Sequence, residues 1–192
     1  MQRDVVLICG QTGSGKSTYA RSVVAGLARA IILDAGFREF EAVHLDSLDD
    51  LLSSVESRRG LDDLEAPFRV SYTPLTDEYN LCFRLASAVG NVTLVLEEAD
   101  RFAERDLPAY EEIIARGRHR GVSILAIAPH PYNFPKNLRR QLTRVVSFRQ
   151  VEESDLDYLA DAVGEEIYCV RDFAPGSFTR YEWTAPGPGK II

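Results

Sequence analysis

The sequence predicts an α/β protein of three layers, in which helices cover a mainly parallel central sheet. Two apolar runs, at residues 92–96 and 122–128, contain no charged side chain, as is typical of strands buried on both faces. A glycine-rich segment at residues 10–17 lies between an apolar run and an amphipathic stretch, which is the strand–loop–helix order of a phosphate-binding loop. Apolar and amphipathic stretches then alternate along the chain, and this alternation is typical of α/β folds.

The individual elements follow from these patterns in chain order. Val5–Ile8 is the apolar run before the glycine-rich segment, and Ser17–Arg21 opens the helix behind it. Residues 47–58 carry one apolar stripe at helical spacing, and Ser47 can cap that helix. The acidic stretch 60–66 is expected to be a surface loop. Strands are expected at 4–9, 30–33, 42–45, 68–73, 92–96, 122–128, 144–148, 167–170 and 177–183, and helices at 16–28, 47–58, 75–89, 107–119, 135–142 and 153–163.

The C-terminal region is expected to end the domain. Phe178, Tyr181 and Trp183 alternate on the last expected strand, a spacing more typical of core residues than of a base-stacking platform. Residues 185–192 contain two Pro-Gly pairs and cannot continue a helix or a central strand. We therefore expect a single domain over residues 1–184 and a flexible tail over residues 185–192.

Composition limits the cellular setting. No apolar run approaches 18 residues, so no transmembrane segment is expected, and the N-terminus lacks the pattern of a signal peptide. Cys9, Cys82 and Cys169 show no metal-ligand spacing, which favours free thiols in a reducing compartment. A cytoplasmic protein is the expectation.

Residues 10–17 match the phosphate-loop pattern G-x-x-x-x-G-K-[S/T] in full. Glycines let the backbone turn sharply, so that successive N–H groups converge on phosphate, and the next helix adds its positive dipole end. We expect Lys16 to reach the outer phosphates of ATP and the Ser17 hydroxyl to bind Mg²⁺. ATP is favoured over GTP because no Asn-Lys-x-Asp segment occurs. The expected nucleotide-binding residues are Gly10, Gln11, Thr12, Gly13, Ser14, Gly15, Lys16, Ser17 and Thr18.

The apolar run at residues 92–96 ends in two acids, Glu97 and Glu98. A buried strand that ends in acids places them beside the phosphate loop. We expect Glu97 to hold Mg²⁺ through its water shell and Glu98 to activate the attacking water as general base. Most motifs of this kind carry Asp at the first position, so Glu97 departs from the pattern by one methylene.

Charge is segregated along the chain, although its net value is −7. Eight basic residues and no acid lie between Arg116 and Arg149, whereas seven acids lie between Glu152 and Glu166. Such segregation indicates contact with a polyanion or pairing between subunits. Two interpretations stay open for Arg139, Arg140 and Arg144: they contact DNA phosphates, or they pair with the acids at 152–166.

Three segments together resemble the FtsK–HerA superfamily of ring-forming DNA pumps. They are residues 10–17, residues 94–100, and the arginine-rich turn at 116–121 with the following 124–131 and Pro135-Lys136. The short length most resembles the genome-packaging ATPases of tailless, membrane-containing double-jelly-roll viruses, and the zonula-occludens-toxin-like assembly proteins of filamentous phages show a related pattern. The resemblance covers roughly residues 4–150 and implies a three-layer RecA-like P-loop NTPase.

The resemblance also implies two further catalytic residues. Such rings place the turn after the arginine-bearing helix at a subunit boundary, and Arg118 is the best match for an arginine that enters the neighbouring site. The tip of the next strand normally reads Ser/Thr-Gln-Arg-Pro and senses the γ-phosphate. This chain has Ala128-Pro129-His130-Pro131 instead, so His130 is the candidate sensor.

The function indicated is a homo-oligomeric ring that hydrolyses ATP and moves double-stranded DNA by backbone contacts, packaging a viral genome into a preformed capsid. Expected partners are duplex DNA, further copies of the chain, and a capsid or membrane protein at a packaging vertex of the virion. Three alternatives stay open. They are a small P-loop nucleotide or metabolite kinase, a zonula-occludens-toxin-like assembly ATPase, and a nucleotide-binding morphogenesis protein without catalysis.

Overall fold

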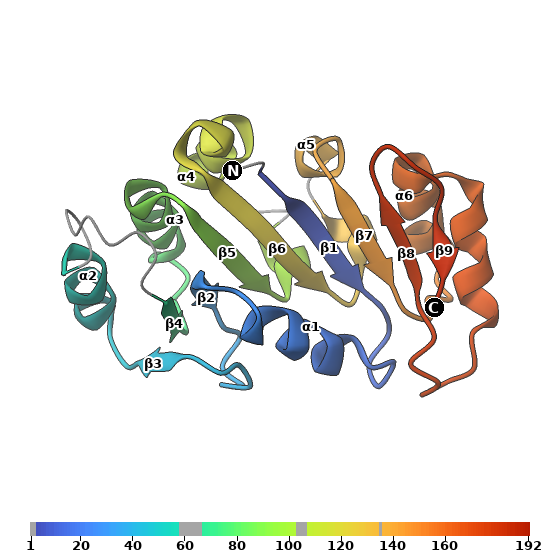
Figure 1. Ribbon diagram of the computed structural model, residues 1–192, viewed down its shortest axis with the longest axis horizontal. Coiled ribbons are helices and arrows are strands. Elements are labelled where there is room, and N and C mark those ends of the chain that lie inside the picture. The colour runs from blue at the N-terminus through green and yellow to red at the C-terminus, as the bar shows by residue number, and fades with distance from the viewer. Residues whose placement is uncertain (1–2, 58–66, 103–106, 135) are drawn as a thin grey trace. The chain divides into compact units, whose positions relative to one another are not determined.

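The structure is a computed structural model that describes residues 3–57, 67–102, 107–134 and 136–192. The loop expected at 60–66 and Pro135 of the resemblance motif lie outside the described residues. Within them, nine strands form a mixed, mostly parallel sheet accompanied by helices (Figure 1), which confirms the α/β class. The chain divides into two compact units, and β6 (Val122–Ala128) contributes residues to both. All seven residues of β6 are buried, as the uninterrupted apolar run predicts.

The first unit comprises Met1–Arg3, Arg21–Glu97 and Asp106–Ile124. Its strand order is β3-β4-β2-β5, and every pair in this run is parallel. Ser47 caps α2 as expected, because its hydroxyl accepts the Asp50 N–H at 3.1 Å. Arg3 donates to the carbonyls of Ile113 and Ile114 near the end of α4, at 3.0 and 2.9 Å, where a cation is favourable. The elements are β2 (Arg29–Leu33), β3 (Val43–Leu45), α2 (Leu48–Glu56), β4 (Phe68–Tyr72), α3 (Tyr79–Val89), β5 (Val92–Glu97), α4 (Pro108–Arg116) and the 3-10 helix η2 (Gly117–Arg120).

The second unit comprises Asp4–Ala20, Glu98–Arg105 and Leu125–Ile192. Here β1 pairs with β7 in parallel, and β8 and β9 follow as antiparallel strands. Arg144 on β7 donates to Glu182 on β8 at 3.0 Å and to the Tyr19 hydroxyl at 2.8 Å. The elements are β1 (Val5–Cys9), the start of α1 (Lys16–Ala25), η1 (Ala99–Phe102), η3 (Pro131–Asn133), α5 (Lys136–Arg139), β7 (Arg144–Ser147), α6 (Glu153–Val163), η4 (Glu165–Asp172), β8 (Tyr181–Thr184) and β9 (Lys190–Ile191).

The strand expected at 167–170 is wrong, because residues 165–172 form the 3-10 helix η4. Ile167 and Val170 are the buried residues of this segment, and their spacing of three is the period of a 3-10 helix. The strand expected at 177–183 begins only at Tyr181. Phe178 lies outside it and has a φ of +57°.

The segment expected as a flexible tail contains β9. Lys190 and Ile191 pair with β8, and the backbones of Arg180 and Ile192 exchange two hydrogen bonds at 3.0 and 2.8 Å. The Ala185 N–H also donates to the Thr143 carbonyl at 2.9 Å. Flexibility over 185–192 and a single domain over 1–184 stay predictions. Cys9, Cys82 and Cys169 are free cysteines, as expected.

Candidate functional site

The phosphate loop leaves the end of β1 and leads into α1, which begins at Lys16. Its first part is tied to the chain beyond β7: the Gln11 N–H donates to the Arg149 carbonyl at 3.0 Å, and Arg149 Nη1 donates to Gln11 Oε1 at 2.6 Å. Its second part closes on itself through the Ser14 N–H, which donates to the Gln11 carbonyl at 3.2 Å. The Tyr19 N–H then makes the first helical bond, to the Gly15 carbonyl, at 3.0 Å.

Two glycines of the loop are required by its geometry. Gly10 has a φ of +151°, and a Cβ atom there would lie 2.6 Å from Phe148 Cβ and 2.7 Å from Ser14 Oγ. Gly15 has a φ of +98°, and a Cβ atom there would collide with the ring of Phe178. A side chain at either position would displace the loop, because L residues rarely adopt these angles.

The loop has the donors that a phosphate needs. The Ser14 hydroxyl is buried and has no hydrogen-bond partner among the described residues. A buried polar group without a partner is costly, so this hydroxyl suits a bound anion. A small hollow lined by residues 11–14, Arg149, Pro175 and Gly176 lies against the loop. The first-turn N–H groups of α1 add the positive end of the helix dipole. The loop and the start of α1 therefore fit a phosphate anion.

Glu98 begins the second unit's segment directly after β5. Its φ is +51°, which is rare and costly for a residue with a long side chain. Arg101 forms an ion pair with its carboxylate. Asp100 lies one residue further on, and burial raises the pKa of its carboxyl, while the charge of His130 opposes this shift. The Asp100 Oδ1 atom has no hydrogen-bond partner among the described residues.

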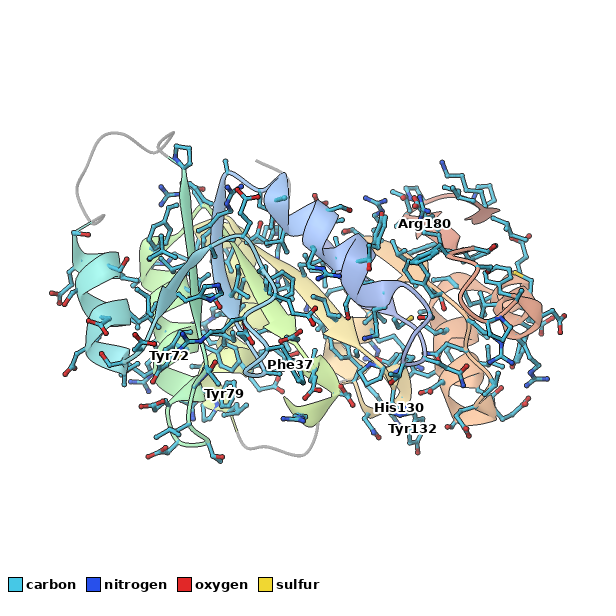
Figure 2. All side chains as sticks on the ribbon, turned by 90° about the horizontal axis from the view of Figure 1, so that it is seen from below. Phe37, Tyr72, Tyr79, His130, Tyr132 and Arg180 are labelled. Atoms are coloured by element: carbon cyan, nitrogen blue, oxygen red, sulfur yellow. The ribbon has the colours of Figure 1, made fainter. Side chains whose placement is uncertain are left out.

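His130 lies two residues after the end of β6 and is paired with Asp155 on α6. Its Nδ1 is 3.2 Å from Asp155 Oδ2, while Asp155 Oδ1 accepts the Tyr132 N–H at 2.9 Å. The Asp155 carboxylate is 1% exposed, whereas the His130 ring is 57% exposed. Figure 2 labels His130 and Tyr132, the two residues that Asp155 contacts in this way. The carboxylate therefore orients an imidazole that keeps its other nitrogen available.

Sequence reasoning missed Asp155, although a signal was present. Asp155 is buried together with Leu156, Tyr158 and Leu159 on α6. An acid within the apolar stripe of a helix is rarely buried without a partner. That pattern predicts that Asp155 has a partner, but nothing in the sequence says that the partner is His130.

Glu97 closes β5 in the first unit and accepts the Ala35 N–H at 2.8 Å. Burial raises the pKa of its carboxyl to about 7, the Ala35 hydrogen bond opposes this shift, and Asp34 and Glu39 add to it. Asp34 is itself 1% exposed and accepts the Gly36 and Phe37 N–H groups at 2.6 and 2.8 Å. Each neighbouring carboxylate disfavours the charged form of the next, which is why the pKa of Glu97 rises further.

The Ser17 hydroxyl, the other expected Mg²⁺ ligand, is half-buried at the start of α1. Among the described residues, no group of three or more His, Cys, Asp or Glu side chains is arranged to hold a metal ion. A site made of one hydroxyl, one carboxylate and waters is not of that kind. Ser17 and Glu97 therefore stay predicted Mg²⁺ ligands.

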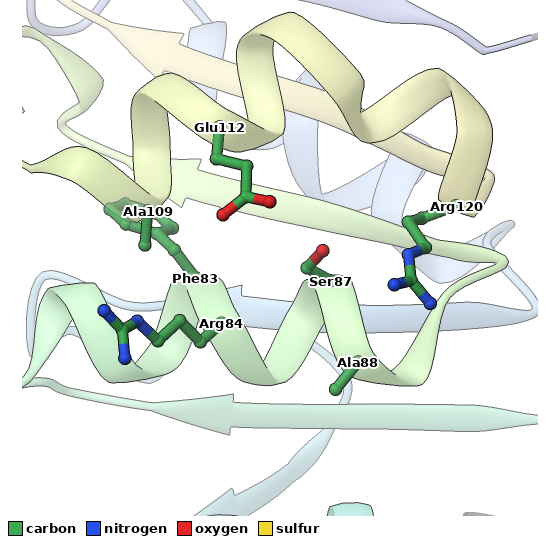
Figure 3. Close-up of a pocket in the computed structure, with 7 residues that line it drawn as sticks. All are labelled: Phe83, Arg84, Ser87, Ala88, Ala109, Glu112 and Arg120. Carbon is green, nitrogen blue, oxygen red and sulfur yellow. The ribbon is translucent and has the colours of Figure 1, made fainter.

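Arg118 lies in η2 of the first unit and is exposed, with no ion-pair partner among the described residues. Arg116 and Arg120 are exposed as well. Arg120 lines a groove between α3 and α4, together with Arg84, Ser87 and Glu112 (Figure 3). An exposed, unpaired arginine meets the requirement for a residue that acts on a neighbouring subunit, and the role itself stays a prediction.

The structure distinguishes the two interpretations that were left open for Arg139, Arg140 and Arg144. Arg139 pairs with Asp161 at 2.8 Å and lies 4.7 Å from the centre of the Tyr158 ring, so it belongs with the acidic segment. Arg144 pairs instead with Glu182. Arg140 is exposed and has no ion-pair partner among residues that the structure describes.

Comparison with known proteins was made for sequence and for structure. A family model described as an AAA domain matches residues 1–134, and no curated protein matches the chain in sequence. Along the described part of the chain, no helix is long and apolar enough to cross a membrane.

Several solved structures share the fold. The genome packaging NTPase B204 from Sulfolobus turreted icosahedral virus 2, in complex with AMPPCP, is 18% identical with a TM-score of 0.76, covering 98% of this chain and 96% of that one. The N-terminal domain of zonular occludens toxin from Neisseria meningitidis is 15% identical with a TM-score of 0.52, covering 100% and 94%. The pCW3 conjugation coupling protein TcpA is 12% identical with a TM-score of 0.65, covering 100% and 60%. These matches confirm the RecA-like P-loop fold and the resemblance to viral packaging ATPases.

The raised pKa of Glu97 predicts how stability depends on pH. The folded state holds this proton up to about pH 7, whereas the unfolded chain releases it near pH 4.3. The folded state therefore binds more protons between these values, and the cost of ionising Glu97 appears as pH rises through this window. In metal-free protein, Glu97→Gln should raise the melting temperature at pH 8 and change it little at pH 4.5.

The matched control is Glu56→Gln, which changes an exposed glutamate of α2 in the same unit. Its melting temperature should follow that of the wild type at both pH values. A Glu97→Gln effect that is equal at pH 4.5 and pH 8 would contradict the assignment of a raised pKa to this carboxyl.

Proposed function

Because the chain belongs to the AAA domain family, we propose that it is an ATP-hydrolysing motor that forms a ring and moves double-stranded DNA. The process proposed is the packaging of a viral genome into a preformed capsid. The single observation that carries ATP binding is the phosphate loop, which is tied to Arg149 beyond β7 and whose buried Ser14 hydroxyl has no hydrogen-bond partner among the described residues. Packaging is supported by the likeness to the genome packaging NTPase B204.

In this proposal the loop's N–H groups and Lys16 bind the phosphates, and Ser17 and Glu97 would hold Mg²⁺. When bound, the metal would neutralise charge on the outer phosphates. Glu98 takes a proton from the attacking water, whose oxygen forms a bond to the γ-phosphorus as the bond from that phosphorus to the leaving oxygen breaks, giving ADP and phosphate. The unusual φ of Glu98 supports this role, because strain of this kind concentrates at functional sites.

His130 is proposed to sense the γ-phosphate in place of the usual glutamine. Its pairing with Asp155 supports the role, since a ring fixed through Nδ1 directs Nε2 consistently. Asp155 is a positioning residue in this scheme. Arg118 is proposed to enter the site of the neighbouring subunit and to stabilise charge that develops on the γ-phosphate.

The proposed partners are duplex DNA, contacted through its backbone, further copies of the chain and a protein at the capsid or membrane vertex. A cytoplasmic location in the host cell, with virion association at the vertex, accompanies this function. Arg140 remains a candidate for DNA contact, whereas Arg139 is paired with Asp161. The likeness to the zonular occludens toxin domain supports a second candidate, an assembly ATPase of filamentous-phage type.

The experiment that tests the function measures ATP hydrolysis with and without linear duplex DNA of several kilobases, together with mass in solution. A DNA motor should be stimulated by long duplex of any sequence, and the stimulation should fall steeply with salt, because phosphate contacts dominate. Stimulation by a small phosphoacceptor instead of DNA would select a kinase. If the protein oligomerises and its rate of ATP hydrolysis is the same with and without DNA, the assembly ATPase would be favoured.

Two variants separate phosphate binding from water activation. Lys16→Ala should abolish ATP binding, because the loop loses its charged contact with the outer phosphates. Glu98→Gln should bind ATP normally and lower turnover by about 10²–10⁴-fold, the usual effect of losing a general base. Calorimetry with ATP and a phosphate-release assay measure the two quantities.

Lys190→Ala and Glu56→Gln are the matched controls, since each changes an exposed residue of the same type. Both should behave as wild type. Near-normal turnover in Glu98→Gln would overturn the base assignment and direct attention to Glu97 or Asp100.

A mixing experiment tests whether Arg118 acts across a subunit boundary. Arg118→Ala and Glu98→Gln should each be inactive alone. Mixed together they should regain part of the activity, because some interfaces then join an intact acid to an intact arginine. An arginine supplied in trans is worth about 10³–10⁵ in turnover, so a few repaired interfaces are measurable by phosphate release.

The control is a chain that carries both substitutions, mixed with either single variant at the same total concentration. The mixture of the double variant with Arg118→Ala contains no intact Arg118 and should remain inactive. If the two single variants assemble and their mixture is also inactive, Arg118 does not act in trans. Arg116 and Arg120 then become the candidates for this role.

A further inference from the structure

The segment between η4 and β8 lies against the phosphate loop within the second unit. Pro175 and Gly176 line the hollow that residues 11–14 and Arg149 also form. Two residues later, the ring of Phe178 packs directly on Gly15, so closely that no Cβ atom fits there. An aromatic ring thus lies beside the glycine that precedes Lys16.

Phe178 is unusual in both its exposure and its backbone. The side chain is 56% exposed although it is large and apolar, and its φ is +57°. A bulky L residue rarely adopts that angle, and because the side chain is not fully buried, burial does not offset the strain. Strained residues of this kind persist where the surrounding structure holds them, and they concentrate at ligand sites.

Hydrogen bonds and a ring contact hold Phe178 from both sides. The Ser177 N–H donates to the Ala174 carbonyl at 3.1 Å, and the Ser177 and Thr179 hydroxyls lie 3.0 Å apart. Arg180 lies 4.9 Å from the centre of the Tyr19 ring on α1 and donates to Glu182 at 2.7 Å. Figure 2 labels Arg180 within the second unit. The helix that begins at the phosphate loop therefore also anchors the segment that carries Phe178.

We propose that Phe178 is the stacking platform for the base of the bound nucleotide. The inference rests on the proposed binding of ATP at residues 10–17 and adds the residue that holds the end of the ligand remote from the phosphates. Two features of Phe178 support it: its large exposed fraction, and the contact of its ring with Gly15 in the loop itself. The π-face of a base packs well on an aromatic ring, with energies that depend little on which base is present.

The test compares two ligands that share phosphates and differ in the base. Calorimetry measures the affinities of a non-hydrolysable ATP analogue and of inorganic tripolyphosphate, both with Mg²⁺. Phe178→Ala should weaken binding of the ATP analogue by about 5- to 150-fold, the range for loss of one base–aromatic stack. It should leave the affinity for tripolyphosphate within about twofold of wild type, because the phosphate loop itself is unchanged.

Further variants keep the test decisive. Phe178→Trp should retain or tighten binding of the analogue, and Phe178→Leu, which keeps apolar bulk without a π-face, should resemble Phe178→Ala. These two variants replace the alanine variant if it fails to fold. Leu75→Ala is the matched control, since Leu75 is 67% exposed and belongs to the other unit, and it should change neither affinity.

The outcomes separate the two proposals. If wild type binds the analogue no more tightly than tripolyphosphate, or if Phe178→Ala weakens both ligands equally, the stacking role is overturned and ATP binding still stands. If wild type binds neither ligand, the phosphate-loop proposal itself fails.

Discussion

The parallel pairing of β1 with β7 is the constraint on which the candidate site depends. The register places Cys9 opposite Ser147, and the Phe148 N–H extends the ladder to the Cys9 carbonyl at 2.9 Å. Arg149 then holds Gln11 through both backbone and side chain. Because the chain beyond β7 runs on past the end of β1 and holds Gln11, the first part of the loop is fixed in place, and its other N–H groups can converge on an anion.

The second unit also contains several of the other candidate site residues. Glu98 and Asp100 follow β5, His130 follows β6, and α6 supplies the buried Asp155 that orients the histidine. Asp155 is costly to bury, and Glu98 is costly to hold at its positive φ. Such costs persist where the surrounding structure enforces them. The first unit contributes Glu97, whose raised pKa reflects neighbouring carboxylates.

Features formed by contiguous residues were predictable from the sequence, whereas contacts between residues far apart in the sequence were not. The phosphate loop could be predicted because its spacing, its glycines and the following helix are contiguous. Buried β6 was predictable for the same reason, since seven consecutive apolar or small residues need no partner to be recognised. The pairing of His130 with Asp155 joins residues 25 apart, and no local pattern encodes it.

Short elements near the C-terminus were predicted less well, because tertiary contacts decide them. Ile167 and Val170 are compatible with a strand or a 3-10 turn, and packing of η4 selects the turn. Phe178 was assigned to the core from its alternation with Tyr181 and Trp183. That alternation is broken by the positive φ of Phe178, which turns its ring onto the phosphate loop. Similarly, only the fold shows that Arg139 pairs with Asp161 rather than remaining free.

The central claim is that the backbone amides of residues 10–18 bind the phosphates of ATP in the conformation that the β1–β7 pair already holds. Amide hydrogen exchange of the wild-type chain, with and without a non-hydrolysable ATP analogue and Mg²⁺, tests it most directly. The account predicts that the ligand slows exchange of peptides covering residues 10–18, while peptides covering α2 (Leu48–Glu56) are unchanged. Saturating ligand that protects another region and leaves residues 10–18 unprotected would contradict it.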